Sequence, residues 1–295
     1  NLVASCAMPA SPGMKIRTDT PRVVEARKMI VEMIWASGDH NCLQCESNGA
    51  CELQDLIYRL GIEKPRFEID PPGYATDNSN TMIFRDLNKC VLCGRCIRGC
   101  NEVQVNEVLD FAQRGNRMKV GPAFDTDYID SACVFCGECL QDCPTGAIIN
   151  KQGRFQGRPW EVRKVRTTCT YCGVGCQLDL NVFNGKVVKT TSDRTHGSPN
   201  WGSLCIKGRF ANEFIHCPDR LTTPLIRRNG KLEEASWDEA LDFIAGKLKD
   251  IKAKHGPDSI GGLSSARATN EDNYIFQKFM RAAVGTNNVD HCARL

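Results

Sequence analysis

Residues 90–100 read CVLCGRCIRGC, and residues 133–144 read CVFCGECLQDCP. Both stretches space their cysteines as C-x2-C-x2-C-x3-C, and the second follows the first by 43 positions. This spacing is typical of proteins with two [4Fe-4S] clusters, in which the fourth cysteine of each run binds the cluster of the other run. Zinc is the alternative metal, but the spacing is not that of a zinc finger. We therefore expect two ligand sets: Cys90, Cys93, Cys96 with Cys143, and Cys133, Cys136, Cys139 with Cys100.

The composition narrows the class of protein. The chain has 295 residues, of which 18 are cysteine, so it is either a disulfide scaffold or a metal-binding protein of a reducing compartment. Repeated C-x2-C pairs favour metal, because two thiolates on one tight turn can reach the same metal centre, and we expect a cytoplasmic location. A net charge of +3 gives no reason to expect a nucleic-acid partner. The sequence has no run of 18 apolar residues, so we expect no membrane span.

A third cysteine group has a different spacing. Cys169, Cys172 and Cys176 are followed by Cys205 in the stretch Cys205-Ile-Lys207-Gly. This pattern resembles the N-terminal [4Fe-4S] domain of the molybdenum or tungsten bis-pterin oxidoreductases. The resemblance implies that these four cysteines hold one cluster. It also implies that Lys207 lies between cluster and pterin and assists electron passage, whereas a lysine outside such a motif is ordinarily a solvated surface charge.

Residues 264–295, SSARATNEDNYIFQKFMRAAVGTNNVDHCARL, resemble the catalytic subunit of formate dehydrogenases. The resemblance implies a Mo or W ion held by two molybdopterin guanine dinucleotides, with formate or CO2 as substrate. In that family the residue after a C-A-R-hydrophobic stretch is the selenocysteine or cysteine that binds the metal, and this sequence ends at Leu295. Our hypothesis is that position 296 is selenocysteine, read as a stop codon; an artificial fragment or disordered density is the alternative.

The N-terminal third resembles the large iron–sulfur subunit of complex I and part of the iron-only hydrogenases. Residues 2–23, LVASCAMPASPGMKIRTDTPRV, are similar to the end of their [2Fe-2S] ferredoxin domain, which implies that Cys6 is a cluster ligand with its partners upstream of Asn1. Cys42, Cys45 and Cys51 match the family's His/Cys3 cubane. The family places the histidine where this chain has Gly38. We therefore predict His40 as the fourth ligand, with Asp39 as runner-up and a plain surface role for His40 as the remaining alternative.

The predicted fold class is α+β and multi-domain, with ferredoxin-like iron–sulfur modules followed by the start of an α/β bis-pterin-binding domain. Arg267 and Asn270 follow a predicted strand, and ligands of open α/β sheets bind beyond the carboxyl ends of strands, so both are candidate pterin contacts. The predicted boundaries are 1–20 for the end of the [2Fe-2S] domain, 21–72 for the His/Cys3 domain, 73–155 for the two-cluster domain, 162–218 for the third cluster domain and 219–295 for the pterin domain.

Local patterns predict the main elements. Thr20 with Pro21 indicates a capped helix, and Asn184-Gly185 between alternating stretches indicates a hairpin with a type I′ turn. Ser236 with Glu239 indicates a capping box. Cys217 and Cys292 fit no ligand set, and we expect both to be buried thiols. The predicted strands are 14–18, 177–183, 186–191 and 259–264; the predicted helices are 21–36, 52–60, 237–255 and 270–284; the predicted linkers are 65–73 and 151–160.

The function that these expectations favour is the electron-relay half of a formate dehydrogenase catalytic subunit. It would carry four [4Fe-4S] clusters, one [2Fe-2S] cluster and part of the Mo or W pterin site. Expected partners are a flavin and iron–sulfur NAD(P)-linked subunit, ferredoxin or hydrogenase subunits. Two alternatives stay open: a complex I-type large iron–sulfur subunit, and an electron-transfer adaptor without an active site.

Overall fold

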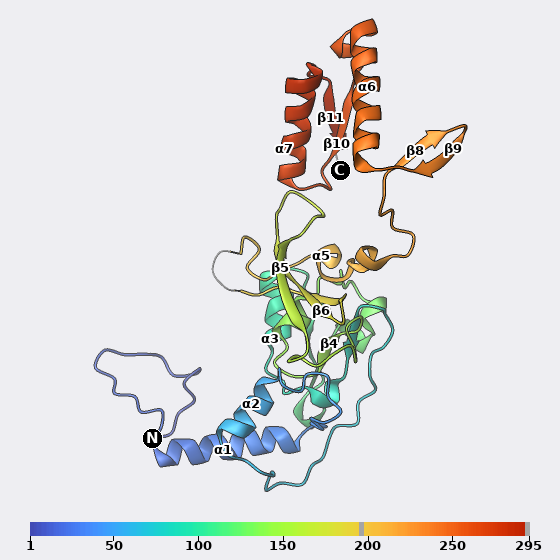
Figure 1. The fold of residues 1–295 in the computed structure, drawn as a ribbon. Helices are drawn as coiled ribbons and strands as arrows, with labels where there is room; N and C mark the ends of the chain where they lie inside the picture. The colour runs from blue at the N-terminus through green and yellow to red at the C-terminus, as the bar shows by residue number, and fades with distance from the viewer. Residues whose placement is uncertain (195–197, 293–295) are drawn as a thin grey trace. The chain divides into compact units, whose positions relative to one another are not determined.

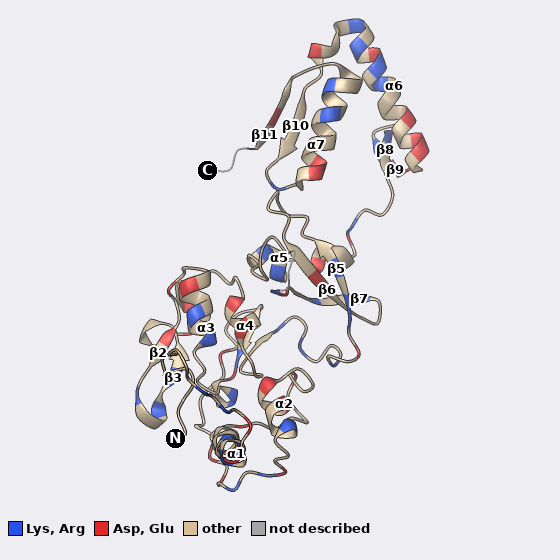
Figure 2. Ribbon diagram, turned by 90° about the vertical axis from the view of Figure 1, so that its left-hand side faces the viewer, with Lys and Arg blue, Asp and Glu red and all other residues tan. Residues whose placement is uncertain are grey.

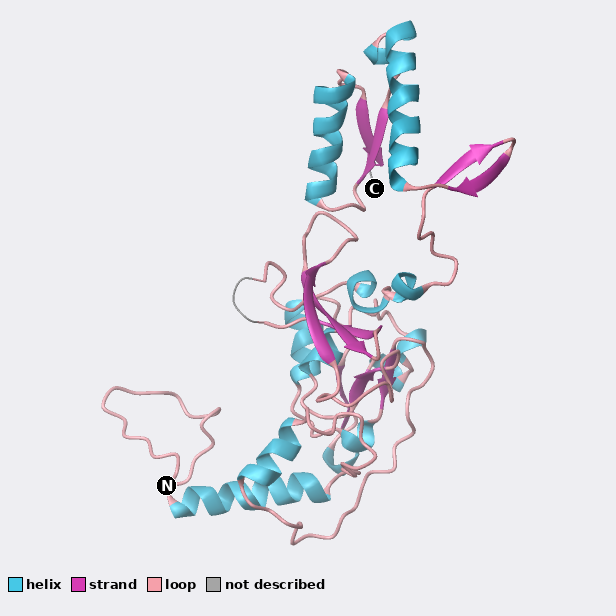
Figure 3. Ribbon diagram, in the orientation of Figure 1, coloured by secondary structure: helices cyan, strands magenta, loops and turns pink. Residues whose placement is uncertain are grey.

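The computed structural model describes residues 1–194 and 198–292. The chain divides into two compact units, Asn1–Val162 and Arg163–Leu295 (Figure 1). The last three residues of the formate dehydrogenase-like stretch, 293–295, lie outside the described residues. Both units mix helices with small sheets, and loops make up much of the first unit (Figure 3).

The first unit begins with two packed helices, α1 at Pro21–Ala36 and α2 at Glu52–Arg59. The predicted cap of α1 is confirmed: the Thr20 hydroxyl oxygen accepts a hydrogen bond from the Val23 N–H at 3.4 Å. The two helices are amphipathic, and burial of their apolar faces stabilises them against each other. The core between them consists of Val31, Leu53, Ile57 and Ile62.

The strand predicted at residues 14–18 is wrong, because the structure has no regular element there. Met14 and Ile16 are exposed by 40% and 71%, so a strand here would have no apolar surface to cover it. A strand also needs a hydrogen-bonded neighbour, and none of the described strands pairs with this segment.

The duplicated cysteine runs form a domain with an approximate internal repeat. Each run carries its third cysteine on a short helix, and a glycine in the left-handed conformation precedes that helix, Gly94 at φ 70° and Gly137 at φ 73°. β1 and β4 pair antiparallel, as do β2 and β3. The bounds are β1 Ile83–Arg85, α3 Arg95–Arg98, β2 Asp110–Ala112, β3 Lys119–Gly121, α4 Glu138–Asp142 and β4 Ile148–Asn150.

The second unit opens with a three-stranded antiparallel sheet of β5 Arg163–Thr168, β6 Gln177–Phe183 and β7 Lys186–Thr191. The predicted hairpin is confirmed, with Asn184 at φ 48° and Gly185 at φ 76°, as a type I′ turn requires. The short helix α5, Ile206–Phe210, follows, and Cys205 is its N-cap. A second Asn-Gly hairpin, which the sequence patterns did not predict, joins β8 Leu225–Arg228 to β9 Lys231–Glu234.

The predicted start of an α/β domain is present in the remainder. The long helix α6 spans Trp237–His255, with acidic residues in its first turn and basic residues in its last, which suits the helix dipole (Figure 2). β10, Gly262–Ser265, runs parallel to β11, Val289–Cys292, and α7, Asn270–Phe279, lies between them in the sequence. This is a β-α-β unit.

Three local predictions in this unit need correction. The Ser236 hydroxyl oxygen accepts from the Glu239 N–H at 3.2 Å, but the Glu239 carboxylate binds Arg228, so the predicted capping box is only half formed. β10 begins at Gly262, because residues 257–259 form a 3-10 turn. Cys217 and Cys292 are exposed, not buried: the first follows a 3-10 turn and the second ends a strand of a two-stranded sheet.

Irregular helical turns complete the chain at Leu87–Lys89, Gly99–Val103, Gly115–Arg117, Ala123–Asp125, Tyr128–Asp130, Glu213–His216, Pro257–Ser259 and Met280–Val284.

Candidate iron–sulfur sites

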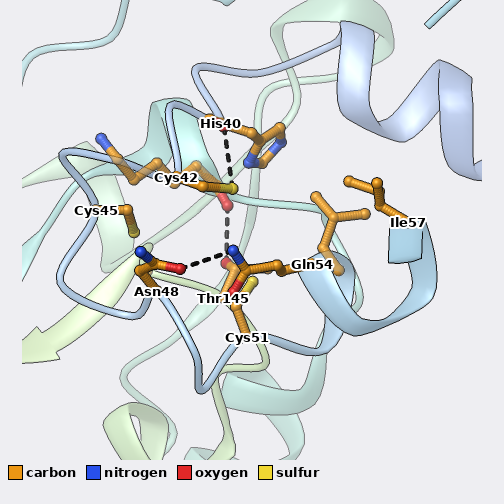
Figure 4. Close-up of a pocket in the computed structure, with 11 residues that line it drawn as sticks. His40, Cys42, Cys45, Asn48, Cys51, Gln54, Ile57 and Thr145 are labelled. Carbon is orange, nitrogen blue, oxygen red and sulfur yellow. Dashed lines mark hydrogen bonds between the residues drawn. The ribbon is translucent and has the colours of Figure 1, made fainter. Parts of the chain in front are cut away.

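The loop between α1 and α2 encloses a cavity with about 360 Å³ of empty space (Figure 4). Its lining includes the predicted ligands His40, Cys42, Cys45 and Cys51, which we call the His40 site. Cys51 is the N-cap of α2, so the helix start fixes one end of the loop. Three thiols and an imidazole around a small enclosed space are a donor set that suits an iron–sulfur cluster.

His40 lies in this cavity with an unsatisfied nitrogen. Its Nε2 is buried and has no hydrogen-bond partner among the described residues. Burial lowers the pKa of His40, although Asp39 acts in the opposite direction, and a neutral ring is the form that binds metal. A buried polar atom without a partner is costly, and a metal bond would remove that cost.

Gly38 explains why the histidine can occupy position 40. A Cβ at residue 38 would lie 2.5 Å from Nε2 of His40 and 2.7 Å from the carbonyl oxygen of Asn88. A side chain at residue 38 would therefore displace the ring. The runner-up Asp39 is not among the residues that line the cavity, and its carboxylate lies 3.7 Å from Nζ of Lys89. The structure thus brings His40, but not Asp39, together with the three thiols.

The walls of the His40 site come from segments that the sequence patterns did not assign to it. Gln54 accepts from the Gly49 N–H and donates to Asn48, both at 2.8 Å. Arg158 donates from Nη1 to the carbonyl oxygen of Cys45 at 2.6 Å. Arg154 binds Glu46 and lies 3.8 Å above the ring of Phe84.

The predicted linker 151–160 also contacts this site. It has no regular element, yet its arginines hold the ligand loop of the His40 site. Gly146 forms another wall, because a Cβ there would meet Sγ of Cys45 at 2.6 Å. Isolated Arg and Gly residues carry no periodic signal, so only the tertiary structure could reveal these contacts.

The duplicated runs line two further cavities. One has about 360 Å³ of empty space and includes Cys90, Cys93, Cys96 and Cys143 in its lining, which we call the Cys90 site. The other has about 340 Å³ and includes Cys133, Cys136, Cys139 and Cys100, which we call the Cys133 site. The structure therefore places the fourth cysteine of each run beside the first three of the other. That each set binds a cubane stays a prediction.

Burial shapes the chemistry of these thiols. It raises the pKa of Cys90 to about 11 and that of Cys96 to about 12. Burial also raises the pKa of Cys139, and the neighbouring thiols add to the effect. Such cysteines stay protonated unless a metal compensates the charge of the thiolates. The donor types at these three sites, and the cost of leaving buried donors without metal, therefore fit iron–sulfur clusters.

The fourth group belongs to the second unit. Cys169, Cys172, Cys176 and Cys205 form what we call the Cys169 site, where burial first, and then the other thiols of the group, raise the pKa of Cys169 and Cys176. The Cys169 N–H donates to the Cys176 carbonyl oxygen at 2.8 Å, which closes the loop. Lys207 is partly buried on α5, two residues after Cys205.

The two candidate pterin contacts differ in their positions. Asn270 donates from Nδ2 to the carbonyl oxygen of Gly173 at 2.7 Å, so it contacts the loop between Cys172 and Cys176. Arg267 is exposed, and its N–H donates to the Ser265 hydroxyl at 3.0 Å. The structure therefore places Asn270 at the Cys169 site and Arg267 on the neighbouring loop surface.

The remaining predicted ligand, Cys6, lies in an exposed turn and lines none of these cavities. Across residues 1–194 and 198–292, no group of three or more His, Cys, Asp or Glu side chains converges closely enough for a single metal ion. No helix in the described part of the chain is long and apolar enough to cross a membrane.

Models of four protein families match successive parts of the chain. They are "NADH-ubiquinone oxidoreductase-G iron-sulfur binding region" at residues 27–66, "4Fe-4S dicluster domain" at 89–147, "Molybdopterin oxidoreductase Fe4S4 domain" at 162–216 and "Molybdopterin oxidoreductase" at 220–295. The chain therefore combines ferredoxin-like iron–sulfur modules with the start of a molybdopterin oxidoreductase domain. The predicted fold class is confirmed.

Curated relatives match nearly the whole chain. It is 36% identical to the NADPH-Fe(3+) oxidoreductase subunit alpha of Geobacter sulfurreducens over 99% of its length. It is 37% identical to an NADH-quinone oxidoreductase subunit of Rhizobium meliloti over 99%, and 32% identical to a putative formate dehydrogenase of Staphylococcus aureus over 98%. The chain spans about a third of the length of these relatives, 34%, 34% and 33%.

A solved structure is also similar. The crystal structure of a NAD+-reducing [NiFe]-hydrogenase in the H2-reduced state has a TM-score of 0.50 and 31% sequence identity, over 52% of this chain and 66% of that chain. The likeness supports an electron-transfer iron–sulfur fold. Since the names of the relatives differ, they leave the substrate open.

Proposed function

We propose that the chain is the electron-relay half of a formate dehydrogenase or CO2 reductase catalytic subunit. The observation that carries the proposal is the contact between Asn270 and the Cys169 site, because it joins the stretch that resembles formate dehydrogenases to a cluster site. The 32% identity to putative formate dehydrogenases adds support.

The residues would divide the work as follows. The His40, Cys90, Cys133 and Cys169 sites would each hold one [4Fe-4S] cluster, and Cys6 would bind part of a [2Fe-2S] cluster. Lys207, Asn270 and Arg267 would contact the pterin. Cubanes supply single-electron exchange, and a Mo or W bis-pterin would supply the two-electron chemistry of formate. The protein residues fix the ligands, exclude water and adjust the potentials through burial and hydrogen bonds to sulfur.

The wider context is part of the same proposal. The five predicted domains would separate these functions along the chain. A flavin and iron–sulfur NAD(P)-linked subunit, ferredoxin or hydrogenase subunits would exchange electrons with the N-terminal sites. We place the protein in the cytoplasm, because free thiolates for metal binding persist in a reducing compartment.

A second candidate is an NAD(P)H-linked oxidoreductase subunit with no formate chemistry. The observation that favours it is the higher identity, 36% and 37%, to relatives with NADPH and NADH in their names. In that case the cluster sites would have the same roles, and Lys207 would have no pterin beside it.

One experiment separates the two candidates. The full-length protein is purified without oxygen, its Mo, W and Fe contents are measured, and its absorbance is followed after addition of formate or of NAD(P)H with the partner subunits. Bound Mo or W and bleaching by formate alone support the first candidate. Absence of both metals, with bleaching only by NAD(P)H, overturns it and supports the second.

A Lys207→Met variant sharpens this test. If Lys207 assists electron passage, formate should still bind while bleaching of the clusters slows by at least about tenfold. Lys231→Met, on the exposed strand β9, is the matched control and should behave as wild type. Equal rates in both variants would remove Lys207 from the proposed path.

A further inference from the structure

The two sites of the duplicated runs share a backbone hydrogen bond at the first cysteine of each run. The Leu92 N–H donates to Sγ of Cys90 at 3.4 Å, and the Phe135 N–H, 43 residues later, donates to Sγ of Cys133 at 3.4 Å. Leu92 and Phe135 have the same positive φ of 52°. This backbone hydrogen bond to the first cysteine of each run is therefore common to both sites.

The side chains break this equivalence. The Tyr128 hydroxyl donates to Sγ of Cys139 at 3.8 Å, and the Asn106 amide donates to Sγ of Cys136 at 3.8 Å. Both acceptors belong to the Cys133 site. The position 43 residues before Tyr128 is Arg85, so the repeat has a phenol in one half and a guanidinium in the other.

The arginine does not serve the Cys90 site as Tyr128 serves the Cys133 site. Its Nη1 donates to the Val120 carbonyl oxygen at 3.2 Å, and its Nη2 lies 3.4 Å from the carboxylate of Asp77. Its guanidinium carbon lies 4.7 Å from the centre of the Tyr128 ring. Arg85 and Asp77 therefore hold the phenol in place, and the Tyr128 N–H, which donates to Asp77 at 2.9 Å, fixes it further.

At the Cys90 site, a side-chain hydroxyl also lies beside a ligand sulfur. The Thr145 hydroxyl oxygen is 3.8 Å from Sγ of Cys143. That hydroxyl donates to the Lys89 carbonyl oxygen at 2.8 Å. Its single hydrogen is thus already used. When Cys143 is a thiolate, this contact has no hydrogen left to share.

We propose that Tyr128 and Asn106 raise the reduction potential of a cluster at the Cys133 site and so distinguish it from the cluster at the Cys90 site. Reduction adds negative charge to a cluster and its thiolates. Donors aimed at the sulfurs stabilise that charge, more so in a buried site. Tyr128 is 1% exposed, so water does not replace its hydrogen bond. The proposal rests on the cluster assignments made under the proposed function.

One group at the same site acts in the opposite direction. Glu138 is 0% exposed and lines the cavity of the Cys133 site, and its carboxylate accepts from Gln104 at 3.3 Å. A buried carboxylate disfavours added negative charge. The prediction therefore concerns the change that follows removal of each donor, whichever of the two clusters has the higher potential in the native protein.

The test is a redox titration of the cluster-loaded full-length protein, monitored by EPR. Tyr128→Phe keeps the ring and removes the donor, and it should move the midpoint of one [4Fe-4S] signal to lower potential. A tenfold change in the electron equilibrium is 59 mV for one electron, and we expect a shift of up to about that size. The other signals should not move.

Two further variants keep the test decisive. Asn106→Leu removes the second donor without touching the buried ring, and it should lower the same midpoint by a smaller amount. Tyr74→Phe is the control, because its ring lies 5.1 Å from Nζ of Lys119 and contacts no ligand sulfur in the described structure. If Tyr128→Phe does not retain its clusters, the Asn106→Leu titration alone decides.

The outcomes are separable from those of the proposed function. Unchanged midpoints in both donor variants, with clusters intact, overturn the inference, as does an equal shift of every cluster. The titration reads the iron–sulfur signals whether or not the protein binds Mo or W or oxidises formate. A failure of the formate proposal would therefore leave this measurement interpretable.

Discussion

The His40 site and the Cys90 site have cavities of the same size, about 360 Å³, but they are built in different ways. At the Cys90 site two runs of regular spacing supply all four predicted ligands, and each run has its own short helix. At the His40 site one irregular loop supplies every predicted ligand, and distant residues such as Arg158 hold the loop in place. A spacing motif can therefore specify one site almost completely and the other only in part.

The difference also concerns what each site connects. Cys143 comes from the second run but lies beside the first, so the Cys90 site ties the two halves of its domain together. All predicted ligands of the His40 site come from one loop, and Gly146 and Arg158 contact that loop at Cys45. Loss of a ligand should therefore damage the fold at the first site, and the local loop at the second.

The largest effect is expected from Cys143→Ala. It removes the ligand that joins the two runs, so the protein should lose the iron of one cubane entirely and unfold at a clearly lower temperature. Cys217→Ala changes an exposed cysteine and is the control. Iron analysis and calorimetry under argon measure both effects. Full iron content in Cys143→Ala would contradict the predicted exchange of fourth ligands.

The next effect is expected from His40→Ala. The loop keeps three thiols, so the cluster at the His40 site should persist in altered form or lose one iron, while the other clusters keep their EPR signals. His40→Cys supplies a donor in the same place and should retain the cluster with a changed spectrum. His255→Ala, at the exposed end of α6, is the control. If the EPR spectrum of this cluster were unchanged in both variants, His40 would not be one of its ligands.

The sequence predicted most of the Cys90 and Cys133 sites, because the spacing of cysteines on tight turns determines which sulfurs can converge. It also predicted α1, the β6–β7 hairpin and the β-α-β start, whose signals are local caps, turns and periodicity. These features depend on residues close together in the chain, which sequence patterns describe well.

The parts that sequence reasoning missed depend on contacts between distant segments. Arg154 and Arg158 lie more than a hundred residues from the loop that they bind, and nothing in their own segment indicates a partner. The exposure of Cys217 and Cys292 likewise depends on what packs against them and not on their neighbours in sequence. The strand predicted at residues 14–18 would need a partner strand and a covering surface, but Met14 and Ile16 are exposed.

A smaller effect is expected from Gly146→Ala, which tests the outer support of the His40 site. The added Cβ would lie 2.6 Å from Sγ of Cys45, so the ligand loop must shift, at a cost of about 1–3 kcal/mol. The Cys90 site lies on the other side of the same segment, since Thr145 lines both cavities, and its signal should change less.

Gly246→Ala is the matched control for this change. Gly246 lies within α6, where a Cβ meets no atom within 4 Å. The same substitution there should stabilise the protein by roughly 0.5–1 kcal/mol, because alanine favours the helix. Denaturant unfolding measures the stability change of each variant, and EPR measures the change in the cluster signals. If both substitutions raised the free energy of unfolding equally, the Cys45 loop would move freely to accept the new Cβ. The loop would then not be held by residues outside its motif, which would contradict the contrast drawn between the two sites.

The smallest effect is expected from Arg158→Ala. It removes hydrogen bonds to the carbonyl oxygens of Cys45 and Leu43, at 2.6 and 3.1 Å. The first is only partly buried and the second is exposed, so the loss should be about 1 kcal/mol. The change should appear as faster hydrogen exchange in the ligand loop, residues 41–48, with the amides of the Cys90 site unaffected. Arg114→Ala, at an exposed position of the same unit, should alter hydrogen exchange neither in the loop nor at the Cys90 site.

Faster exchange at both sites in Arg158→Ala would mean that Arg158 supports the whole unit. Faster exchange confined to the loop would show that the His40 site owes its shape to residues outside its motif.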